Sequence, residues 1–302
     1  DMHARTSGLA DYLAHDEHEC LAIGRDIVEH LNWRKHGPGP TEPPDEPLFD
    51  PEELLDIASV DLKVPFDPRE VLARVVDGSR FEEYKPLYGT ALVCGWASIH
   101  GFPVGVLANA HGVLFNDEAK KGTEFILLCN QTDTPLVFLQ NTTGFMVGTQ
   151  YEQNGMIKDG AKMINAVTNS TVPHITINLA ASYGAGNYGM SGRSYDPRLL
   201  FTWPSSKTAI MGPDQLAGVM SIVARQAAAN AGRPFDEEAD AARTKALAER
   251  VEAESLALYM SGQGYDDGII DPRDTRSVLG MALSMCHSRE IAGTRGFAVF
   301  RM

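Results

Sequence analysis

The sequence predicts an α/β fold with a largely parallel sheet. Segments rich in β-branched and apolar residues, such as 136–140 and 175–180, alternate with segments of helical periodicity. Each of these two strands runs into a turn of small residues, 141–148 and 182–189, and the two turns lie about 40 residues apart. Strands separated by helices favour parallel pairing in a layered α/β structure.

Residues 1–51 are expected to precede the main fold. Apolar residues at helical spacing predict a helix over 11–33, and the proline-rich run 37–51 predicts an extended linker or loop. We therefore interpret 1–36 as the last helix of a preceding domain, 37–51 as a linker and 52–302 as the main domain.

The main domain is expected to alternate strands and helices along the chain. A helix that begins after Asp67 should be capped by this residue, the helix 118–130 should place Lys120, Lys121 and Glu124 on its solvent face, and Asp271 should cap the last helix or its turn. The expected helices are 68–76, 118–130, 158–169, 215–229, 236–260 and 275–291, and the expected strands are 90–100, 104–108, 136–140, 175–180, 201–204 and 209–211.

Charge and composition exclude several classes of partner. The net charge of -14 argues against nucleic acid or an anionic membrane as a partner, since both would be repelled. No run approaches the ~20 apolar residues of a membrane span. The four cysteines and the histidines show no spacing that suits a metal, so no metal is expected, and the cysteines should be small buried hydrophobes in a reducing cytoplasm (Cys20, Cys94, Cys129 and Cys286).

The turn at 182–189 is the main candidate for a functional site. A strand that enters a glycine-rich turn before a helix presents backbone N–H groups without helical partners, which can bind an anion or a developing oxyanion. The spacing G-A-G-N-Y-G at 184–189 approaches a dinucleotide motif, but no acidic residue stands about 20 residues further on, so this is the poorer interpretation. A glycine turn that serves packing alone stays open.

Several longer stretches together resemble one family. They are LVFLQNTTGFMVG at 136–148, GAKMINAV at 160–167, YGAGNYGMSGRSYDPRLLFTWP at 183–204, MGPDQLAGV at 211–219 and DDGIIDPRDTR at 266–276. In this order they are similar to the C-terminal half of the carboxyltransferase (β) subunit of biotin-dependent acyl-CoA carboxylases, and most similar to the methylcrotonyl-CoA type. The resemblance implies a crotonase-like (ClpP/crotonase) β-β-α spiral.

The resemblance also implies a reaction and its residues. Carboxybiotin on a carrier protein would donate its carboxyl group to an acyl-CoA, methylcrotonyl-CoA-like as first choice, with acetyl-, propionyl- or longer acyl-CoA as alternatives. The backbone N–H groups of Ala185 and Gly186 would stabilise the oxyanion on the biotin side. Gly144, Phe145 and Gly184 would shape the biotin pocket, and Tyr188 would select the acyl chain unless it is a half-buried core tyrosine.

The implied partners are a biotin carboxylase and biotin carboxyl carrier subunit, the N-terminal carboxyltransferase half with most of the CoA site, and further copies in a homo-oligomer, expected as a hexamer of β subunits. Two substitutions would test the predicted site residues. Gly186→Val should abolish transfer while leaving the fold largely intact, and Tyr188→Asp should alter the preferred acyl-CoA.

Two rival functions stay open. A crotonase-like hydratase, isomerase or hydrolase that acts on acyl-CoA without biotin would need carboxylates near the turns, where Glu152 and Asp159 are the nearby acids. A non-catalytic assembly subunit would keep the fold alone. Beside the turn, Arg193, Asp196 and Arg198 are expected to form a structural ion network rather than to act as catalysts.

Overall fold

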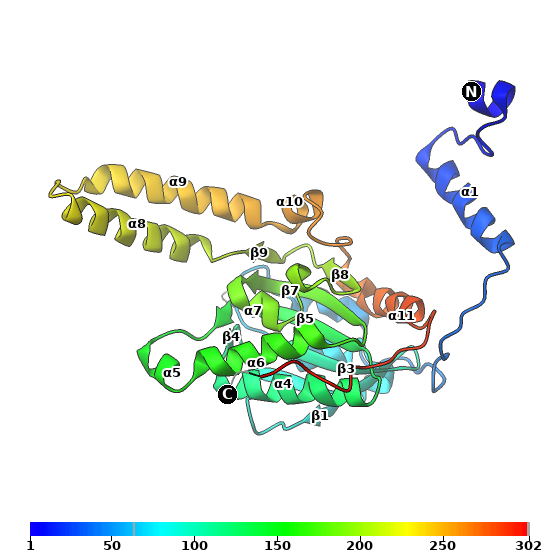
Figure 1. Ribbon diagram of the computed structural model, residues 1–302, viewed down its shortest axis with the longest axis horizontal. Coiled ribbons are helices and arrows are strands. Elements are labelled where there is room, and N and C mark those ends of the chain that lie inside the picture. Colours follow the sequence, from blue (N-terminus) through cyan, green and yellow to red (C-terminus); the bar gives the residue numbers. More distant parts are fainter. Residues whose placement is uncertain (63, 301–302) are drawn as a thin grey trace. The chain divides into compact units, whose positions relative to one another are not determined.

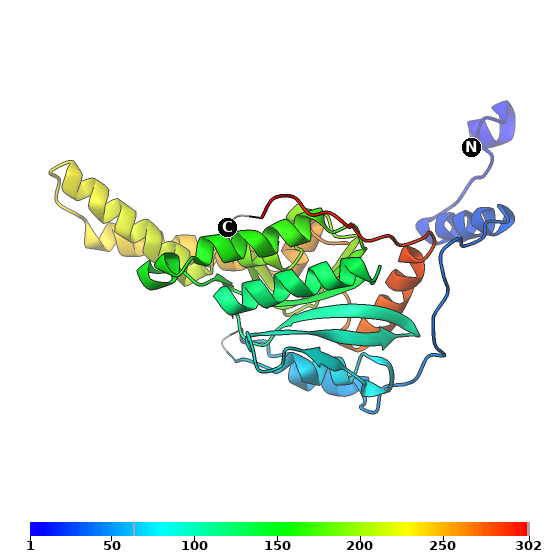
Figure 2. The same cartoon turned by 60° about the horizontal axis from the view of Figure 1, so that its bottom comes forward.

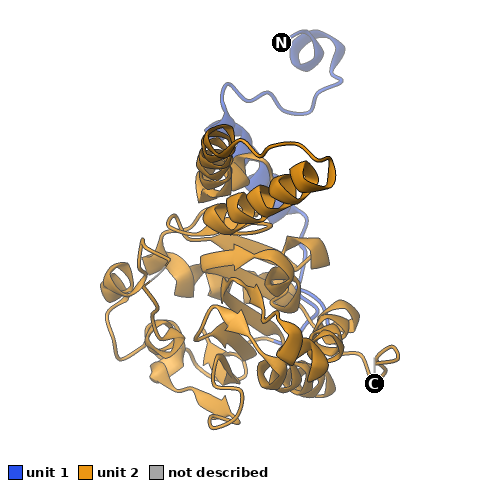
Figure 3. Ribbon diagram, turned by 90° about the vertical axis from the view of Figure 1, so that its left-hand side faces the viewer, with its two compact units in different colours: residues 1–38, 287–290 blue, residues 39–286, 291–302 orange. Residues whose placement is uncertain are grey.

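The computed structural model describes residues 1–62 and 64–300, and the chain divides into two compact units. One unit consists of Asp1–Pro38 with His287–Glu290, and the other of Gly39–Cys286 with Ile291–Met302 (Figure 3). The boundary at Pro38 falls inside the predicted linker. Beyond it, Thr41 N donates a hydrogen bond to Gly101 O at 2.9 Å, so this part of the proline-rich run is attached to the second unit.

The first unit contains helix α1, Glu17–His30, which is shorter than the predicted helix over 11–33. Asp16 has an extended backbone, and its carboxylate accepts a hydrogen bond from Glu19 N at 2.8 Å, so the helix begins after this cap. It ends before Asn32, which has a left-handed φ of 52°. No residue of α1 is buried. Cys20 is therefore exposed, and the expectation that it is a buried hydrophobe is wrong.

The second unit is built on a mixed sheet of seven strands in its described part, in the order β1-β2-β3-β5-β7-β8, with β9 also paired to β7 (Figure 1). Its strands are β1 (Glu82–Tyr84), β2 (Leu92–Ile99), β3 (Phe102–Asn109), β5 (Leu136–Thr142), β7 (His174–Tyr183), β8 (Leu199–Thr202) and β9 (Lys207–Ala209). A separate pair joins β4 (Val113–Leu114) to β6 (Gly144–Phe145).

The parallel pairing predicted from the alternation of strands and helices is confirmed for β3, β5, β7, β8 and β9. The strands β1, β2 and β3 pair antiparallel instead. The β2–β3 hairpin turns at His100 and Gly101, whose φ angles are 49° and 77°, and a two-residue hairpin turn of this kind favours left-handed backbone.

Helices cover both faces of the sheet (Figure 2). On one face α4 (Asn116–Gln131) and α6 (Met156–Asn169) bury a core that includes Phe125, Met163 and Phe138. On the other face α3 (Pro68–Ala73) and α11 (Thr275–Cys286) bury Leu72, Leu283 and the residues of β7 that face them. Because both faces are covered, every residue of β7 is buried, as expected for a central parallel strand.

The remaining helices connect or extend these layers. They are α2 (Leu54–Ile57), α5 (Thr149–Gln153), α7 (Gly184–Gly189), α8 (Pro213–Asn230), α9 (Glu237–Ser255) and α10 (Ala257–Gly262). Helices α8 and α9 form a hairpin beside the strand β9 (Figure 1). The predicted single helix over 236–260 is wrong: Leu256 has an extended ψ of 144° and forms a bridge to Lys207, which interrupts the helix.

The predicted helix caps and solvent-facing residues are confirmed with one exception, Lys121. Asp67 and Asp271 cap as expected, accepting hydrogen bonds from Arg69 N and Arg273 N. Lys121, expected on the solvent face of α4, is fully buried, and its Nζ lies 3.4 Å from Gly89 O in the β1–β2 connection that covers it. Burial lowers the pKa of this ammonium group.

Candidate active site

Strand β7 carries polar and apolar side chains on opposite faces as it approaches the glycine turn. Ile175, Ile177 and Leu179 belong to the core shared with α3 and α11. The side chains on the opposite face are polar at four positions along the strand, and all of them are buried (His174, Thr176, Asn178 and Ser182). The polar face therefore continues to the end of the strand where α7 begins.

A chain of buried hydrogen bonds holds α7 against the sheet. Asn187 Nδ2 donates to Ser182 Oγ at 2.6 Å, and Ser182 Oγ donates to Gln140 Oε1 at 2.6 Å. Gln140 Nε2 in turn donates to Met190 O at 2.7 Å, just after α7. Buried polar groups that satisfy one another in this way fix a single geometry, so this chain ties the second half of α7, at Asn187 and at Met190 just after its end, to β7 and β5.

One face of α7 packs on the other small-residue turn. A Cβ added to Gly186 would lie 2.5 Å from Thr142 Oγ1 and 2.8 Å from Gly144 Cα, and one added to Gly189 would lie 2.9 Å from Phe145 Cζ. Since such contacts are shorter than real Cβ atoms make, the two turns approach each other as closely as they do because glycine stands at both positions. A valine at Gly186 would displace the neighbouring turn, so the expectation that Gly186→Val leaves the fold largely intact is corrected.

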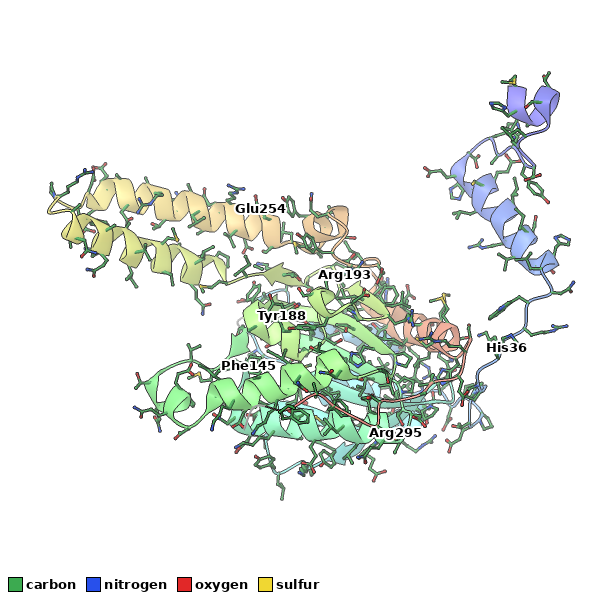
Figure 4. All side chains as sticks on the ribbon, in the orientation of Figure 1. His36, Phe145, Tyr188, Arg193, Glu254 and Arg295 are labelled. Carbon is green, nitrogen blue, oxygen red and sulfur yellow. The ribbon has the colours of Figure 1, made fainter. Side chains whose placement is uncertain are left out.

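The opposite face of α7 borders a cavity of about 570 Å³. Gly184, Asn187 and Tyr188, at positions that share one helix face, line it together with β8, β9, α9 and α10. Figure 4 shows Tyr188 on α7, Arg193 after it and Glu254 on α9; all three residues line the cavity. Its volume lies within the range of small-molecule sites.

The structure separates the predicted site residues into two groups. Gly184 and Tyr188 line the cavity, and Tyr188 is 39% exposed with its ring edge-on to Tyr195 at 5.3 Å between centroids. Gly144 and Phe145 do not line it and lie on the far side of α7, next to Gly186 and Gly189. The sequence analysis assigned Gly144, Phe145 and Gly184 to one biotin pocket and gave Tyr188 a separate role in acyl selection, whereas in the structure Gly184 lies with Tyr188 and apart from Gly144 and Phe145.

The predicted oxyanion donors lie at the start of α7. Ala185 is exposed, whereas Gly186 is buried. Within residues 1–62 and 64–300, no hydrogen bond uses the backbone N–H of Ala185 or Gly186, as expected for the first turn of a helix. Gly184, with a φ of 55°, makes the left-handed turn from β7 into α7.

The charged groups of the cavity are partly paired. Arg193 Nη1 lies 3.4 Å from Asp267 Oδ2, so Arg193 pairs with Asp267 and not with Asp196 as expected from sequence. Glu254 accepts a hydrogen bond from Arg250 Nε at 2.8 Å. Asp266 also lines the cavity, and neither of its carboxylate oxygens has a hydrogen-bond partner in the described chain.

Sequence reasoning missed Asn178, Glu254 and Asp266 as cavity residues. Two signals were present: Asn178 is a polar residue inside an apolar strand, and Asp266 begins the acidic pair of DDGIIDP. Neither signal says which segments meet in space, so Glu254 and Asp266 could not be connected with the turn at 182–189.

The acidic residues near the first turn do not form a second catalytic site. Asp159 is buried and accepts hydrogen bonds from Asn116 Nδ2 at 2.9 Å and Lys162 Nζ at 3.2 Å. Burial opposes its ionisation, but these hydrogen bonds and the nearby ammonium groups outweigh burial and lower the pKa of Asp159. Glu152 is exposed on α5. Among the described residues no group of three or more His, Cys, Asp or Glu side chains could hold a metal ion.

His174 is also structural. Its two ring nitrogens lie 2.8 Å from Ser191 Oγ and 2.8 Å from Ser170 Oγ, and burial lowers the pKa of His174 to about 4. In the part of the chain that the structure covers, no helix is long and apolar enough to cross a membrane.

Comparison with known proteins places these features in one family. A model of the carboxyl transferase domain matches residues 1–298. The chain is 63% identical over 302 residues to a probable biotin-dependent acyl-coenzyme A carboxylase beta2 subunit of Mycobacterium tuberculosis, covering 100% of this chain and 57% of that protein. It is 49% identical over 305 residues to the mitochondrial methylcrotonoyl-CoA carboxylase beta chain of Dictyostelium discoideum, covering 100% of this chain and 51% of that protein.

Solved structures give the same result. The β subunit of geranyl-CoA carboxylase from P. aeruginosa has a TM-score of 0.81 at 40% identity and is matched by 100% of this chain over 57% of its own. A transcarboxylase 12S hexamer with methylmalonyl-coenzyme A and methylmalonic acid bound has a TM-score of 0.75 at 30% identity, with the same shares covered. The chain thus spans about half the length of the curated relatives it matches. The predicted crotonase-like fold is confirmed, and the chain belongs to the carboxyl transferase domain family.

Proposed function

We propose that this chain is the biotin-side half of the carboxyltransferase of a biotin-dependent acyl-CoA carboxylase. The observation that carries the proposal is the similarity of the whole chain to biotin-dependent acyl-CoA carboxylase β subunits, at 63% identity over 302 residues. The geometry of the β7–α7 turn supports it in two separate features: free backbone N–H groups begin α7 at Ala185 and Gly186, and the helix face with Gly184, Asn187 and Tyr188 borders a cavity of small-molecule size, which Ala185 and Gly186 do not line.

The residues present fit a biotin group. When bound, carboxybiotin supplies the activated carboxyl group. The N–H groups of Ala185 and Gly186 would donate to an oxygen that gains negative charge, and one such donor is worth about 3 kcal/mol of barrier. The hydrogen-bonded chain from Gln140 through Ser182 to Asn187 keeps these donors in one orientation. Gly144 and Phe145 would act indirectly, by supporting α7 from its other face.

The proposed acyl substrate is a branched unsaturated acyl-CoA of the methylcrotonyl type. Relatives named as methylcrotonoyl-CoA carboxylase beta chains support this choice. Tyr188 would select the acyl chain, since it lines the cavity from α7 and keeps part of its surface exposed.

The proposed partners complete the site. They are a biotin carboxylase and biotin carboxyl carrier subunit, an N-terminal carboxyltransferase half with most of the CoA site, and further copies in a hexamer, as in the 12S neighbour. Helix α1 would be the last helix of that N-terminal half, which is supported by its lack of buried residues and by the exposure of Leu21, Val28 and Leu31. The proposed compartment is the cytoplasm, where the four cysteines, all free thiols, would stay reduced.

The rival without biotin is less well supported. A crotonase-like hydratase, isomerase or hydrolase needs a carboxylate that exchanges protons with water or substrate. Asp159 is held in ion pairs, and the oxygens of Asp266 are closed off from solvent. Glu152 is exposed but does not line the cavity, and Glu254, which does, is hydrogen-bonded to Arg250. A non-catalytic assembly subunit would not need the free N–H groups at Ala185 and Gly186.

The reaction run in reverse tests the proposal. The chain, supplied with an N-terminal carboxyltransferase half, is incubated with free biotin or biocytin and a panel of carboxylated acyl-CoAs, and decarboxylated product is followed. Turnover with a branched unsaturated acyl-CoA is expected. Turnover with malonyl- or methylmalonyl-CoA alone would change the substrate and keep the reaction, and no turnover with any member would favour one of the rivals.

A further inference from the structure

Tyr188 is the cavity residue to which the proposed function assigns acyl selection, and its ring is in contact with a second tyrosine. The rings of Tyr188 and Tyr195 meet edge to face, with 5.3 Å between their centroids and 79° between their planes. Aromatic pairs prefer this kind of arrangement to a face-to-face stack. Tyr188 lines the cavity, whereas Tyr195 does not. A residue outside the cavity therefore contacts the ring that would meet the acyl chain.

The Tyr195 ring is the main directional contact of the Tyr188 side chain. Within residues 1–62 and 64–300, no other aromatic ring pairs with Tyr188, and no hydrogen bond fixes its phenol oxygen. Tyr188 is 39% exposed. A partly exposed side chain samples several staggered rotamers unless a neighbour favours one of them. The edge-to-face contact is thus what favours the observed orientation of the Tyr188 ring.

The loop after α7 fixes Tyr195 in turn. Tyr195 N donates a hydrogen bond to Gly192 O at 2.9 Å, and Gly192 N donates one to Asn187 O at 2.8 Å. A Cβ added to Gly192 would lie 1.9 Å from Asn187 Oδ1, so this close approach of the loop to α7 depends on glycine. Asn187 is itself bound to Ser182, so the buried hydrogen-bond chain that holds α7 extends to the loop of Tyr195.

The residues of this loop have different surroundings. Arg193, labelled in Figure 4, and Ser194 line the cavity. The ring of Tyr195 is partly buried and packs instead on the core that α4 and α6 bury. Because close-packed core contacts restrict the motion of a side chain, Tyr195 is a firm support for the ring of Tyr188.

We propose that Tyr195 is a positioning residue for acyl selection, which holds the ring of Tyr188 in the orientation that borders the cavity. The inference rests on the proposed function, which makes Tyr188 the residue that selects the acyl chain, and it deepens that function by naming the residue that orients Tyr188. Tyr195 does not touch the substrate. Its effect on the reaction passes through one ring, so the effect should disappear when that ring is removed.

The test replaces the ring of Tyr195 and follows acyl selection. The chain is supplied with an N-terminal carboxyltransferase half, and kcat/KM for transfer is measured with a branched unsaturated and with a short saturated acyl-CoA. Tyr195→Leu keeps an apolar side chain on the core and removes the ring. Loss of one edge-to-face pair should lower the ratio of the two kcat/KM values about fivefold. Tyr195→Phe keeps the ring and should retain the wild-type ratio.

Tyr151→Leu is the matched control. Tyr151 is partly buried on the same core as Tyr195 and pairs with the ring of Phe115 at 5.8 Å between centroids. It does not line the cavity and forms no ring pair with Tyr188. Tyr151→Leu removes a comparable aromatic pair and should leave the ratio unchanged.

A double variant separates positioning from a general effect on the fold. In a Tyr188→Leu background the ring to be oriented is absent, so adding Tyr195→Leu should not change the ratio further. A purely structural role would lower transfer with both acyl-CoAs by the same factor. A wild-type ratio in Tyr195→Leu, or an equal fall in the Tyr188→Leu background, overturns the inference. Tyr195→Met, with a flexible side chain, carries the test if Tyr195→Leu fails to fold.

A measurement without substrate distinguishes failure of this inference from failure of the proposed function. The chain is labelled with fluorotyrosine, and the fluorine NMR resonance that is lost in Tyr188→Phe is assigned to Tyr188. This resonance should shift in Tyr195→Leu, because the neighbouring ring is removed, and not in Tyr151→Leu. If it shifts but the wild type transfers to no acyl-CoA, the proposed function fails and the positioning of the ring stands. If transfer occurs and the resonance does not shift, the inference fails and the proposed function stands.

Discussion

The two small-residue turns look alike in sequence but need glycine for different reasons. In the turn after β5, Gly144 and Gly148 have φ angles of 135° and 130°, and a Cβ on Gly144 would meet nothing within 4 Å. In the turn after β7, Gly186 and Gly189 are not in the left-handed region, but a Cβ there would lie less than 3.0 Å from the other turn. The first turn needs glycine for its backbone, whereas the second needs Gly184 for its left-handed backbone and Gly186 and Gly189 for close packing.

This difference predicts how each turn tolerates change. Backbone strain is local, whereas a packing clash is transmitted to the neighbouring turn and to the donors at the start of α7. Substitutions in the second turn should therefore have larger effects on both stability and transfer.

The largest effect is expected for Gly186→Ala. The added Cβ would overlap Thr142 Oγ1 and Gly144 Cα, and overpacking of this kind costs up to about 3 kcal/mol of unfolding free energy. Urea unfolding measures the loss, and the transfer assay should show lost activity. Gly218→Ala, at an open position inside α8, is the control and should stabilise by about 0.5 kcal/mol. Equal stability of the two variants would contradict the close packing of the turns.

The second largest effect is a loss of stability at low pH, which is expected from the buried His174 on β7 and has no counterpart at the neighbouring position on β5. His174 on β7 is paired in register with the apolar Leu136 on β5. Its pKa in the folded chain is about 4, below its value of 6.5 when unfolded. The unfolded chain therefore binds the proton first, so stability is complete above pH 6.5 and falls as the pH drops from 6.5 toward 4, by about 2 kcal/mol at pH 5.

The measurement is urea unfolding at pH 7 and pH 5 for the wild type and for His174→Gln. The variant should lose less stability than the wild type between the two pH values, because the other titrating groups are shared. An identical loss in both proteins would mean that His174 does not contribute.

The third effect concerns the hydrogen bonds that hold α7. Ser182→Ala removes the acceptor of Asn187 and the donor to Gln140, and leaving buried polar groups unpaired costs about 1.5 kcal/mol. The matched control is Thr143→Ala in the first turn, which removes an exposed hydroxyl that donates to Gly112 O and should cost about 0.5 kcal/mol or less. Unfolding free energies that rank in the reverse order would contradict the role of this chain.

A smaller loss is expected for Gly144→Ala, about 1 kcal/mol from backbone strain alone. Since the added Cβ meets no neighbour, the transfer activity should fall much less than for Gly186→Ala. Comparing both variants in the two assays checks the distinction between the turns. A similar loss of transfer in both would show that the first turn takes part in the site directly.

The smallest effect on stability is expected for Tyr188→Asp, within about 0.5 kcal/mol, because the side chain is 39% exposed. The acyl preference should change instead, since Tyr188 lines the cavity. The readout is the ratio of transfer rates for a branched unsaturated and a short saturated acyl-CoA, with Tyr188→Phe as the control that keeps the ring. An unchanged ratio in Tyr188→Asp would remove Tyr188 from acyl selection.

The sequence by itself determined the alternation of strands and helices, the caps at Asp67 and Asp271, the two glycine turns and the family, because these depend on local periodicity and on short motifs. Local patterns did not determine where Lys121 would lie, since its burial depends on a distant connection around Gly89.

Only the tertiary structure decided that the turn after β7 borders the cavity and that the turn after β5 packs on the other face of α7. The cavity joins residues 178–188 to 251–266, and contacts such as that between Leu200 and Asp267 span 67 positions of the chain. Packing at such separations brings Asn178 and Asp266 into the lining of the same cavity, and no residue pattern within either segment specifies this arrangement.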